Sequence, residues 1–247
     1  MAKRPERLCS MHQFWHDLLF LHWEVPVDRL QSLIPPELTI DTYEGKAYIG
    51  LVAFRISQIR KRGFPAVPGL RQFPEINVRT YVHKAGKDPG VWFFSLDASN
   101  LFACIGARMA YKLPYYFSEI TQMDTANASK VTTQFRSKRY LPRPLPAYAT
   151  IDYTVQNDPV TMAEKDSLEH FFVERYLLYS QVGDGICVGQ VYHAPYPIER
   201  VVVTRLEENL VQAAGIMHPD SAPIIHFSRG VDVLIYSLEH QQSAVVN

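Results

Sequence analysis

The stretch Phe73-Pro74-Glu75-Ile76-Asn77-Val78-Arg79-Thr80-Tyr81-Val82-His83 alternates strictly from Glu75 onward. Ile76, Val78, Thr80 and Val82 fall on one face, and Glu75, Asn77, Arg79, Tyr81 and His83 fall on the other. A period of two residues predicts a β-strand, because a helix would repeat every 3.6 residues. The fold then depends on where the polar face of this strand points.

Two interpretations of that polar face stay open at the level of sequence. In one, Glu75 and Arg79 form an ion pair on a solvated sheet face or belong to a structural network. In the other, the sheet closes and Arg79 anchors a carboxylate or carbonyl oxygen inside a cavity. The pattern alone favours the solvated face, because antiparallel sheets commonly leave one face exposed to water.

Strand patterns dominate the rest of the chain and helices are few. Most strands follow one another in hairpin-like order, which predicts a mainly β (α+β) fold built from antiparallel sheet with short helices added. The length fits a single domain over residues 1–247, and the proline-rich Leu141–Pro146 is the most linker-like stretch. Expected strands are Thr39–Tyr43, Lys46–Ile59, Glu75–His83, Val91–Leu96, Tyr115–Gln122, Lys130–Tyr140, Ala147–Gln156, Glu174–Ser180, Ile186–His193, Ile198–Arg205, Ile224–Ser228 and Val231–Leu238; expected helices are Val27–Ile34, Ser99–Tyr111, Ser167–Phe172 and Glu207–Ala214.

The charge balance argues against some classes of partner. Lys and Arg total 25 and Asp and Glu total 25, so the formal net charge is zero. A duplex-binding protein usually carries a basic excess, and a balanced chain exerts no long-range attraction on an anionic membrane. We therefore expect neither a nucleic-acid nor a membrane partner, whereas homo-oligomer formation stays open.

The cysteines and the known catalytic motifs give little indication of a function. Three widely separated cysteines give no disulfide framework, which favours a reducing, cytoplasmic location. Phosphate-binding, nucleophile-elbow and zinc-protease signatures are absent from the sequence. His12 and His16 have the spacing of two metal ligands on a helix, but their apolar neighbours favour packed or surface histidines. No metal and no cofactor are expected.

Several separated segments resemble one family, in the same order along about residues 11–238. The chain resembles the YqjF-like family of uncharacterised proteins, which is similar to the acetoacetate-decarboxylase-like superfamily. That resemblance implies antiparallel strands curled into a cone or barrel around an internal cavity. The matching segments are Phe14–Trp23, Leu33–Leu38 with Asp41, Phe73–Val82, Gly90–Asp97, Phe172–Tyr176 with Tyr179, His193–Pro197 and His226–Arg229.

The same resemblance also marks a difference in chemistry. Ala107–Tyr116 is similar to the decarboxylase segment in which two lysines follow a proline, and Arg108 matches the arginine of that segment. In the decarboxylase one lysine forms a Schiff base and the other lowers its pKa. Here Tyr115 and Tyr116 stand after Pro114, and a phenol cannot form an imine. Schiff-base decarboxylation is therefore expected to be absent.

Two functional hypotheses follow, and whether the chain is an enzyme stays open between them. In the first, the cavity binds a small apolar acid or carbonyl compound without converting it. In the second, Glu75 or Glu174 acts as a general base beside a tyrosine on a carbonyl substrate. The residues expected to contact the ligand are Asn77, Arg79, Tyr81, Trp92, Arg108, Tyr115, Tyr116 and Tyr176.

Overall fold

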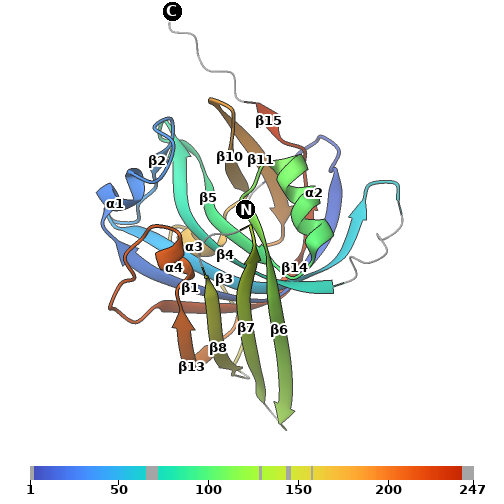
Figure 1. Cartoon of the computed structure of the whole chain (residues 1–247), viewed down its shortest axis with the longest axis vertical. Coiled ribbons are helices and arrows are strands. Elements are labelled where there is room, and N and C mark those ends of the chain that lie inside the picture. The colour runs from blue at the N-terminus through green and yellow to red at the C-terminus, as the bar shows by residue number, and fades with distance from the viewer. Residues whose placement is uncertain (1–2, 65–71, 128–129, 143–145, 157, 241–247) are drawn as a thin grey trace, which may run out of the picture.

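A computed structural model describes residues 3–64, 72–127, 130–142, 146–156 and 158–240. Strands form most of the described chain, as the sequence predicts, and the helices are short (Figure 1). The strands are β1 Met11–Val25, β2 Thr39–Ile40, β3 Ala47–Lys61, β4 Gln72–Lys84, β5 Lys87–Ala98, β6 Tyr115–Asn127, β7 Lys130–Leu141, β8 Tyr148–Val155, β9 Thr161–Met162, β10 Leu177–Val182, β11 Gly185–His193, β12 Pro197–Ile198, β13 Val201–Glu208, β14 Ile224–Ile235 and β15 Glu239–His240. The helices are α1 Val27–Gln31, α2 Leu101–Tyr111, α3 Leu168–Val173 and α4 Leu210–Ala213.

One strongly curled sheet organises these elements into a cone-like shape. From β5 the pairings run through β10, β11, β14, β1, β3 and β4 and return to β5. Within this circuit only the β5–β10 pairing is parallel. β6 lies parallel to β5, and β6, β7, β8 and β13 extend from one side of the circuit (Figure 1).

The close approach of β10 to β5 depends on a glycine. A Cβ atom at Gly90 would lie 2.7 Å from the Leu177 carbonyl oxygen and 2.8 Å from the Tyr179 ring. No side chain fits in that space, so only glycine permits the parallel pairing of Leu178 with Val91. Gly90 therefore allows β10 to pair with β5 and the sheet to curl back on itself at this point.

Strand β1 is the largest element that the sequence reasoning missed. It pairs with both β14 and β3, and its alternation places Leu19, Leu21 and Trp23 in one apolar cluster but Leu18 and Phe20 in another. The alternation is hidden in the sequence because both faces are apolar, and because β1 contains a bulge at Asp17, whose φ is 51°. The helical spacing of His12 and His16 is therefore a spacing along a strand.

The polar face of β4 is buried, so the solvated-face interpretation is wrong. Ile76, Val78 and Val82 pack in the first apolar cluster, as the alternation predicts. On the opposite face Glu75 is 1% exposed and Asn77 is 4% exposed. No ion pair joins Glu75 to Arg79 within the described residues. These polar groups instead face the interior of the curled sheet.

Many expected elements elsewhere form with shifted bounds, but the expected pairing of 39–43 with 46–59 is wrong. The Glu44-Gly45 turn forms, but the expected hairpin is limited to one bridge between Tyr43 and Lys46, since β2 pairs with β4 rather than with β3. The expected strands at 224–228 and 231–238 are one strand, β14. Helix α2 begins where the Asn100 side chain accepts a hydrogen bond from the Ala103 N–H at 3.1 Å, and it ends at Tyr111, which Lys112 follows as the C-cap.

The single domain over residues 1–247 and the formation of a homo-oligomer stay predictions. Residues 143–145 of the linker-like stretch lie outside the described residues. Within the part of the chain that the structure describes, no helix has the length and apolar character needed to cross a membrane.

Candidate functional site

A cavity of about 580 Å³ lies inside the curled sheet, on the polar face of β4. Most of its wall is apolar, with side chains from β1, β3, β5 and β14, while α2 forms one side through Phe102 to Tyr111. Glu75, Asn77, Arg79 and Tyr115 are polar groups in this wall. An apolar cavity with a few polar groups is the usual form of a small-molecule site. Its apolar residues include Trp15, Leu18, Phe54, Phe73, Phe93 and Leu178.

Glu75 is a carboxyl group held mainly in its neutral form. Its pKa is raised to about 8, mainly by burial and in smaller part by the charge of nearby Asp97, while hydrogen bonds from Tyr115 and Asn77 oppose the rise. The Tyr115 hydroxyl donates to Glu75 Oε2 at 3.0 Å. At neutral pH Glu75 therefore adds little negative charge to the cavity and can donate a hydrogen bond.

Arg79 is a cation in the cavity wall without a carboxylate partner among the described residues. Its Nη2 donates to the Phe172 carbonyl oxygen at 3.0 Å, and its Nε is buried with no hydrogen-bond partner. The guanidinium also lies 5.6 Å from the centre of the Phe20 ring. Because a buried charge is costly unless it is paired, this guanidinium has unused capacity to bind an anion.

Tyr81 is not part of the cavity wall, but its hydroxyl shares the Phe172 carbonyl oxygen with Arg79. Its hydroxyl donates to the Phe172 carbonyl oxygen at 3.1 Å and lies 2.6 Å from His22 Nε2. Burial and the charge of Arg79 hold the pKa of His22 well below its ordinary value, so this imidazole is neutral. The neutral ring can donate from Nε2 to the Tyr81 oxygen, which fixes the position of the tyrosine.

The other predicted ligand contacts lie outside the cavity wall. Trp92 packs against the first apolar cluster, whereas its neighbour Phe93 faces the cavity, because successive residues of a strand point to opposite faces. Arg108 is exposed, and its Nη1 donates to the Tyr115 carbonyl oxygen at 2.6 Å. The Tyr116 ring lies 3.7 Å from the Arg139 guanidinium, away from the cavity. Ligand contact by these residues stays a prediction.

Glu174 and Tyr176 form a separate contact beside the cavity. The Tyr176 hydroxyl donates to Glu174 Oε2, and the Tyr196 backbone N–H donates to Glu174 Oε1 at 2.9 Å. Tyr196 does line the cavity, and sequence reasoning missed it. The carboxylate of Glu174 thus positions a wall residue, while Glu75 is the one carboxyl group in the described cavity wall.

The histidines considered as metal ligands have separate partners. His12 lies 3.0 Å from Asp232 Oδ1, and His16 Nε2 lies 2.6 Å from the Ser57 hydroxyl. The described residues contain no group of three or more His, Cys, Asp or Glu side chains that could hold a metal ion.

Comparison with known proteins matches the family to nearly the whole chain. The profile of the DUF2071 family, described as an uncharacterised conserved protein, matches residues 12–232. The chain belongs to the DUF2071 family. The chain is 36% identical over 234 residues to the uncharacterised protein YqjF of Bacillus subtilis. The alignment covers 95% of this chain and 93% of YqjF.

Solved structures share the fold with this DUF2071 protein at low sequence identity. The enduracididine biosynthesis enzyme MppR complexed with pyruvate has a TM-score of 0.63 at 12% identity, covering 95% of this chain and 91% of MppR. Acetoacetate decarboxylase of Legionella pneumophila has a TM-score of 0.61 at 11% identity, covering 99% and 94%. An acetoacetate-decarboxylase-like enzyme of Sphingomonas wittichii RW1 has a TM-score of 0.60 at 12% identity, covering 96% and 95%. The expected acetoacetate-decarboxylase-like fold is confirmed.

Proposed function

We propose that the cavity binds a small apolar carboxylic acid or carbonyl compound, and that Arg79 holds its oxygen atoms. Asn77 and neutral Glu75 supply further hydrogen-bonding groups, and the aromatic and aliphatic wall receives the apolar part of the ligand. The resemblance to the decarboxylase superfamily supports a cavity ligand of this size. The tyrosine at position 115 argues against a Schiff base as the means of holding it.

The unpaired guanidinium is the observation that carries this proposal. Neutral Glu75 cannot compensate Arg79, and Arg175 nearby is paired with Asp41 at 2.6 Å. Among the described residues, the Arg79 guanidinium donates only to neutral acceptors, the Phe172 carbonyl and the Tyr81 hydroxyl. A carboxylate in the cavity would supply the missing partner in a low-dielectric site, where charge-assisted hydrogen bonds are strong.

Thermal unfolding with matched acids and amides tests the proposal. Pyruvate, which the MppR structure contains, hexanoate and phenylpyruvate are the acids, with hexanamide as the uncharged counterpart of hexanoate. At about 100 times Kd an acid should stabilise the protein by roughly 2.7 kcal/mol. Arg79→Gln should abolish the shift, while the exposed control Arg200→Gln should keep it. Equal shifts for hexanoate and hexanamide, or no shift with any acid, would overturn the proposal.

A second function is favoured by one specific observation, the pairing of Glu75 with Tyr115 inside the cavity. A carboxyl group with a pKa of about 8 is suited to exchange protons near neutral pH, as general acid–base catalysts do. Ionised Glu75 would remove a proton from the carbon next to a carbonyl group. Tyr115 and Arg79 would then hold the enolate oxygen by hydrogen bonds.

Proton exchange in heavy water distinguishes this function from binding alone. Deuterium incorporation into the methyl group of pyruvate would be followed by NMR. The exchange rate should rise as pH increases through about 8, because the base must be ionised. Glu75→Gln should remove it, and Glu119→Gln, which changes an exposed carboxylate, should not. If acids bind but none of these carbons exchanges, the binding function stands and catalysis is excluded for that substrate.

A further inference from the structure

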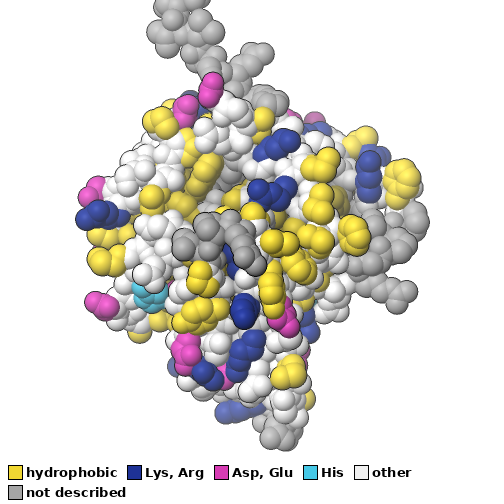
Figure 2. All heavy atoms as spheres, in the orientation of Figure 1, with side chains coloured by type: hydrophobic (Ala, Val, Ile, Leu, Met, Phe, Trp, Pro, Cys, Tyr) yellow, Lys and Arg dark blue, Asp and Glu magenta, His cyan; other side chains and the backbone are white. Residues whose placement is uncertain are grey.

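Helix α2 carries several large, exposed apolar side chains, of which only Phe102 also reaches the rim of the cavity. Phe102 is 78% exposed, Met109 is 70% exposed and Ile105 is 47% exposed. Leu101, Ile105 and Met109 are spaced four residues apart, so they form one ridge along the helix. A helix that is apolar on all sides is normally covered by another surface. In Figure 2 the hydrophobic side chains gather over α2.

Basic side chains border this ridge, and no described carboxylate forms an ion pair with them. Lys61 is the last residue of β3 and Arg62 follows it, while Arg108 lies on α2 and Lys112 directly after it. All four side chains are exposed. None of the four forms an ion pair with a described residue. Residues 60–64 and 101–112 contain no Asp or Glu. We name as the α2 face Lys61, Arg62, Phe64, Leu101, Phe102, Ile105, Arg108, Met109 and Lys112.

The two segments of the α2 face are tied together beside the cavity. The Arg62 N–H donates to the Ser10 carbonyl oxygen at 3.1 Å, and the Ser10 hydroxyl lies 3.2 Å from the Tyr111 hydroxyl. Lys61 and Phe102 belong both to this face and to the cavity wall. The exposed apolar surface is thus continuous with the apolar interior.

We propose that the α2 face docks on the surface of an anionic lipid bilayer. Apolar side chains that enter the headgroup region, bordered by Lys and Arg, are the features of interfacial membrane contact. A second copy of the chain would set like charges against one another. The exposed aliphatic ridge does not suit a nucleic acid, whose recognition uses hydrogen bonds and stacking. The zero net charge of the whole chain hides this local excess.

Co-sedimentation with lipid vesicles tests this proposal on the full chain without a cavity ligand. The protein should bind vesicles of phosphatidylcholine mixed with phosphatidylglycerol, bind phosphatidylcholine alone more weakly, and dissociate as salt is raised. Arg62→Glu with Lys112→Glu should weaken partitioning by at least roughly 25-fold, since each lost basic residue contributes about a factor of five and the new carboxylates are repelled by the anionic surface. Ile105→Ser with Met109→Ser should weaken it by about tenfold.

Matched controls use exposed residues far from the α2 face in sequence. Lys165→Glu alters a cation whose side chain is 82% exposed, and Met217→Ser alters an apolar residue that is 90% exposed. Both should bind vesicles like the parent protein. Absence of binding to the mixed vesicles would overturn the proposal. So would a dimer in solution that Ile105→Ser with Met109→Ser dissociates, because the face would then join two copies. Vesicle binding is measured independently of acid binding, so either proposal can fail alone.

Discussion

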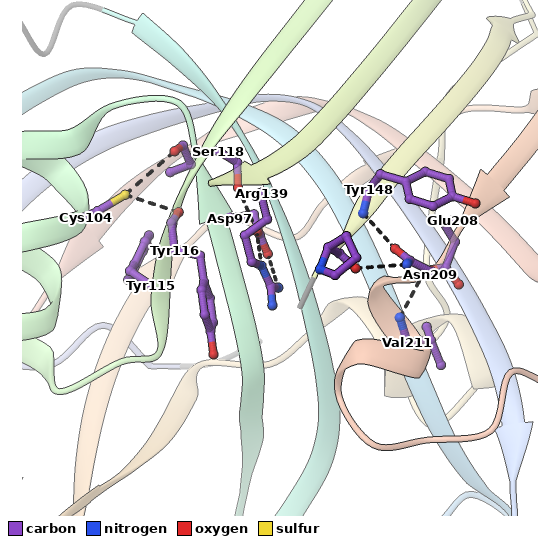
Figure 3. Close-up of polar contacts among 12 residues, drawn as sticks. Asp97, Cys104, Tyr115, Tyr116, Ser118, Arg139, Tyr148, Glu208, Asn209 and Val211 are labelled. Carbon is purple, nitrogen blue, oxygen red and sulfur yellow. Dashed lines mark hydrogen bonds and ion pairs between the residues drawn. The ribbon is translucent and has the colours of Figure 1, made fainter. Parts of the chain in front are cut away.

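The neighbouring strands β4 and β5 each carry ionisable side chains, but among the described residues only Asp97 of β5 has an oppositely charged partner. Asp97 on β5 accepts hydrogen bonds from Arg139 Nε and Nη2, each at 2.7 Å, and from the Ser118 hydroxyl at 2.7 Å (Figure 3). Asp97 pairs with Ile76 across the strands, so it points away from the face of Glu75. On that other face, Glu75 has no cation and Arg79 has no carboxylate among the described residues.

The difference separates structural charge from charge available to a ligand. Both charges of the Asp97–Arg139 pair are satisfied within the chain, and the guanidinium also stacks on Tyr116 (Figure 3). Such a pair holds β5, β6 and β7 together. In the cavity, the fold neutralises Glu75 by burial and leaves Arg79 to neutral acceptors. Removing a charge should therefore have opposite effects on stability in the two places.

The largest effect is expected at the structural pair. Arg139→Met leaves Asp97 buried without a cation, which should lower the free energy of unfolding by about 3–5 kcal/mol. Urea denaturation measures this loss. Arg205→Met is the control, since it removes an exposed ion pair with Glu207, which solvent screens, and should leave the free energy of unfolding nearly unchanged. If Arg139→Met lowered the free energy of unfolding by less than about 1 kcal/mol, the Asp97–Arg139 pair would not be a structural pair of the kind contrasted with the cavity charges.

A pH dependence is expected from Glu75. Its pKa is raised from 4.5 to about 8, so between these values the folded state holds a proton that the unfolded state has released. The contribution of Glu75 to stability should be complete below pH 4.5, fall by up to about 1.4 kcal/mol per pH unit, and be lost above about pH 8. Urea denaturation of the parent and of Glu75→Gln across this range should show the difference. A constant difference would mean that Glu75 is ionised in the fold.

A smaller effect of opposite sign to that of Arg139→Met is expected at Arg79. Arg79→Met removes an unpaired, half-buried charge, so the ligand-free protein should keep its stability or gain about 1 kcal/mol. Denaturation without added acid measures this change. A loss of 3 kcal/mol or more would place Arg79 with Arg139 as a structural cation, in conflict with the proposed ligand site.

No effect is expected from a test for Schiff-base chemistry. Incubation with acetoacetate and borohydride should leave the protein mass unchanged, because Tyr115 cannot form an imine for borohydride to reduce. Intact-mass spectrometry detects any adduct, and an acetoacetate decarboxylase serves as the positive control. A reduced adduct on Lys112 or another lysine would show that covalent carbonyl chemistry persists in this chain.

The sequence determined the class of fold and which residues of β4 share a face. The alternation from Glu75 to His83 predicts a strand whatever surrounds it, because successive side chains point to opposite faces. The resemblance to the YqjF-like family predicts the curled sheet, and the family and fold comparisons confirm it. The tyrosine pair after Pro114 also excludes an imine at those positions by chemistry alone.

Tertiary structure decided which predicted residues meet. Period-two alternation cannot say whether a polar face meets water or an interior, and pairing of β4 with β3 and β5 within the closed circuit turned Glu75, Asn77 and Arg79 inward. Strand β1 escaped detection because both its faces are buried, which removes the alternation that marks a strand. Burial by distant segments, rather than neighbours in sequence, is what neutralises Glu75 and leaves Arg79 without a counter-ion.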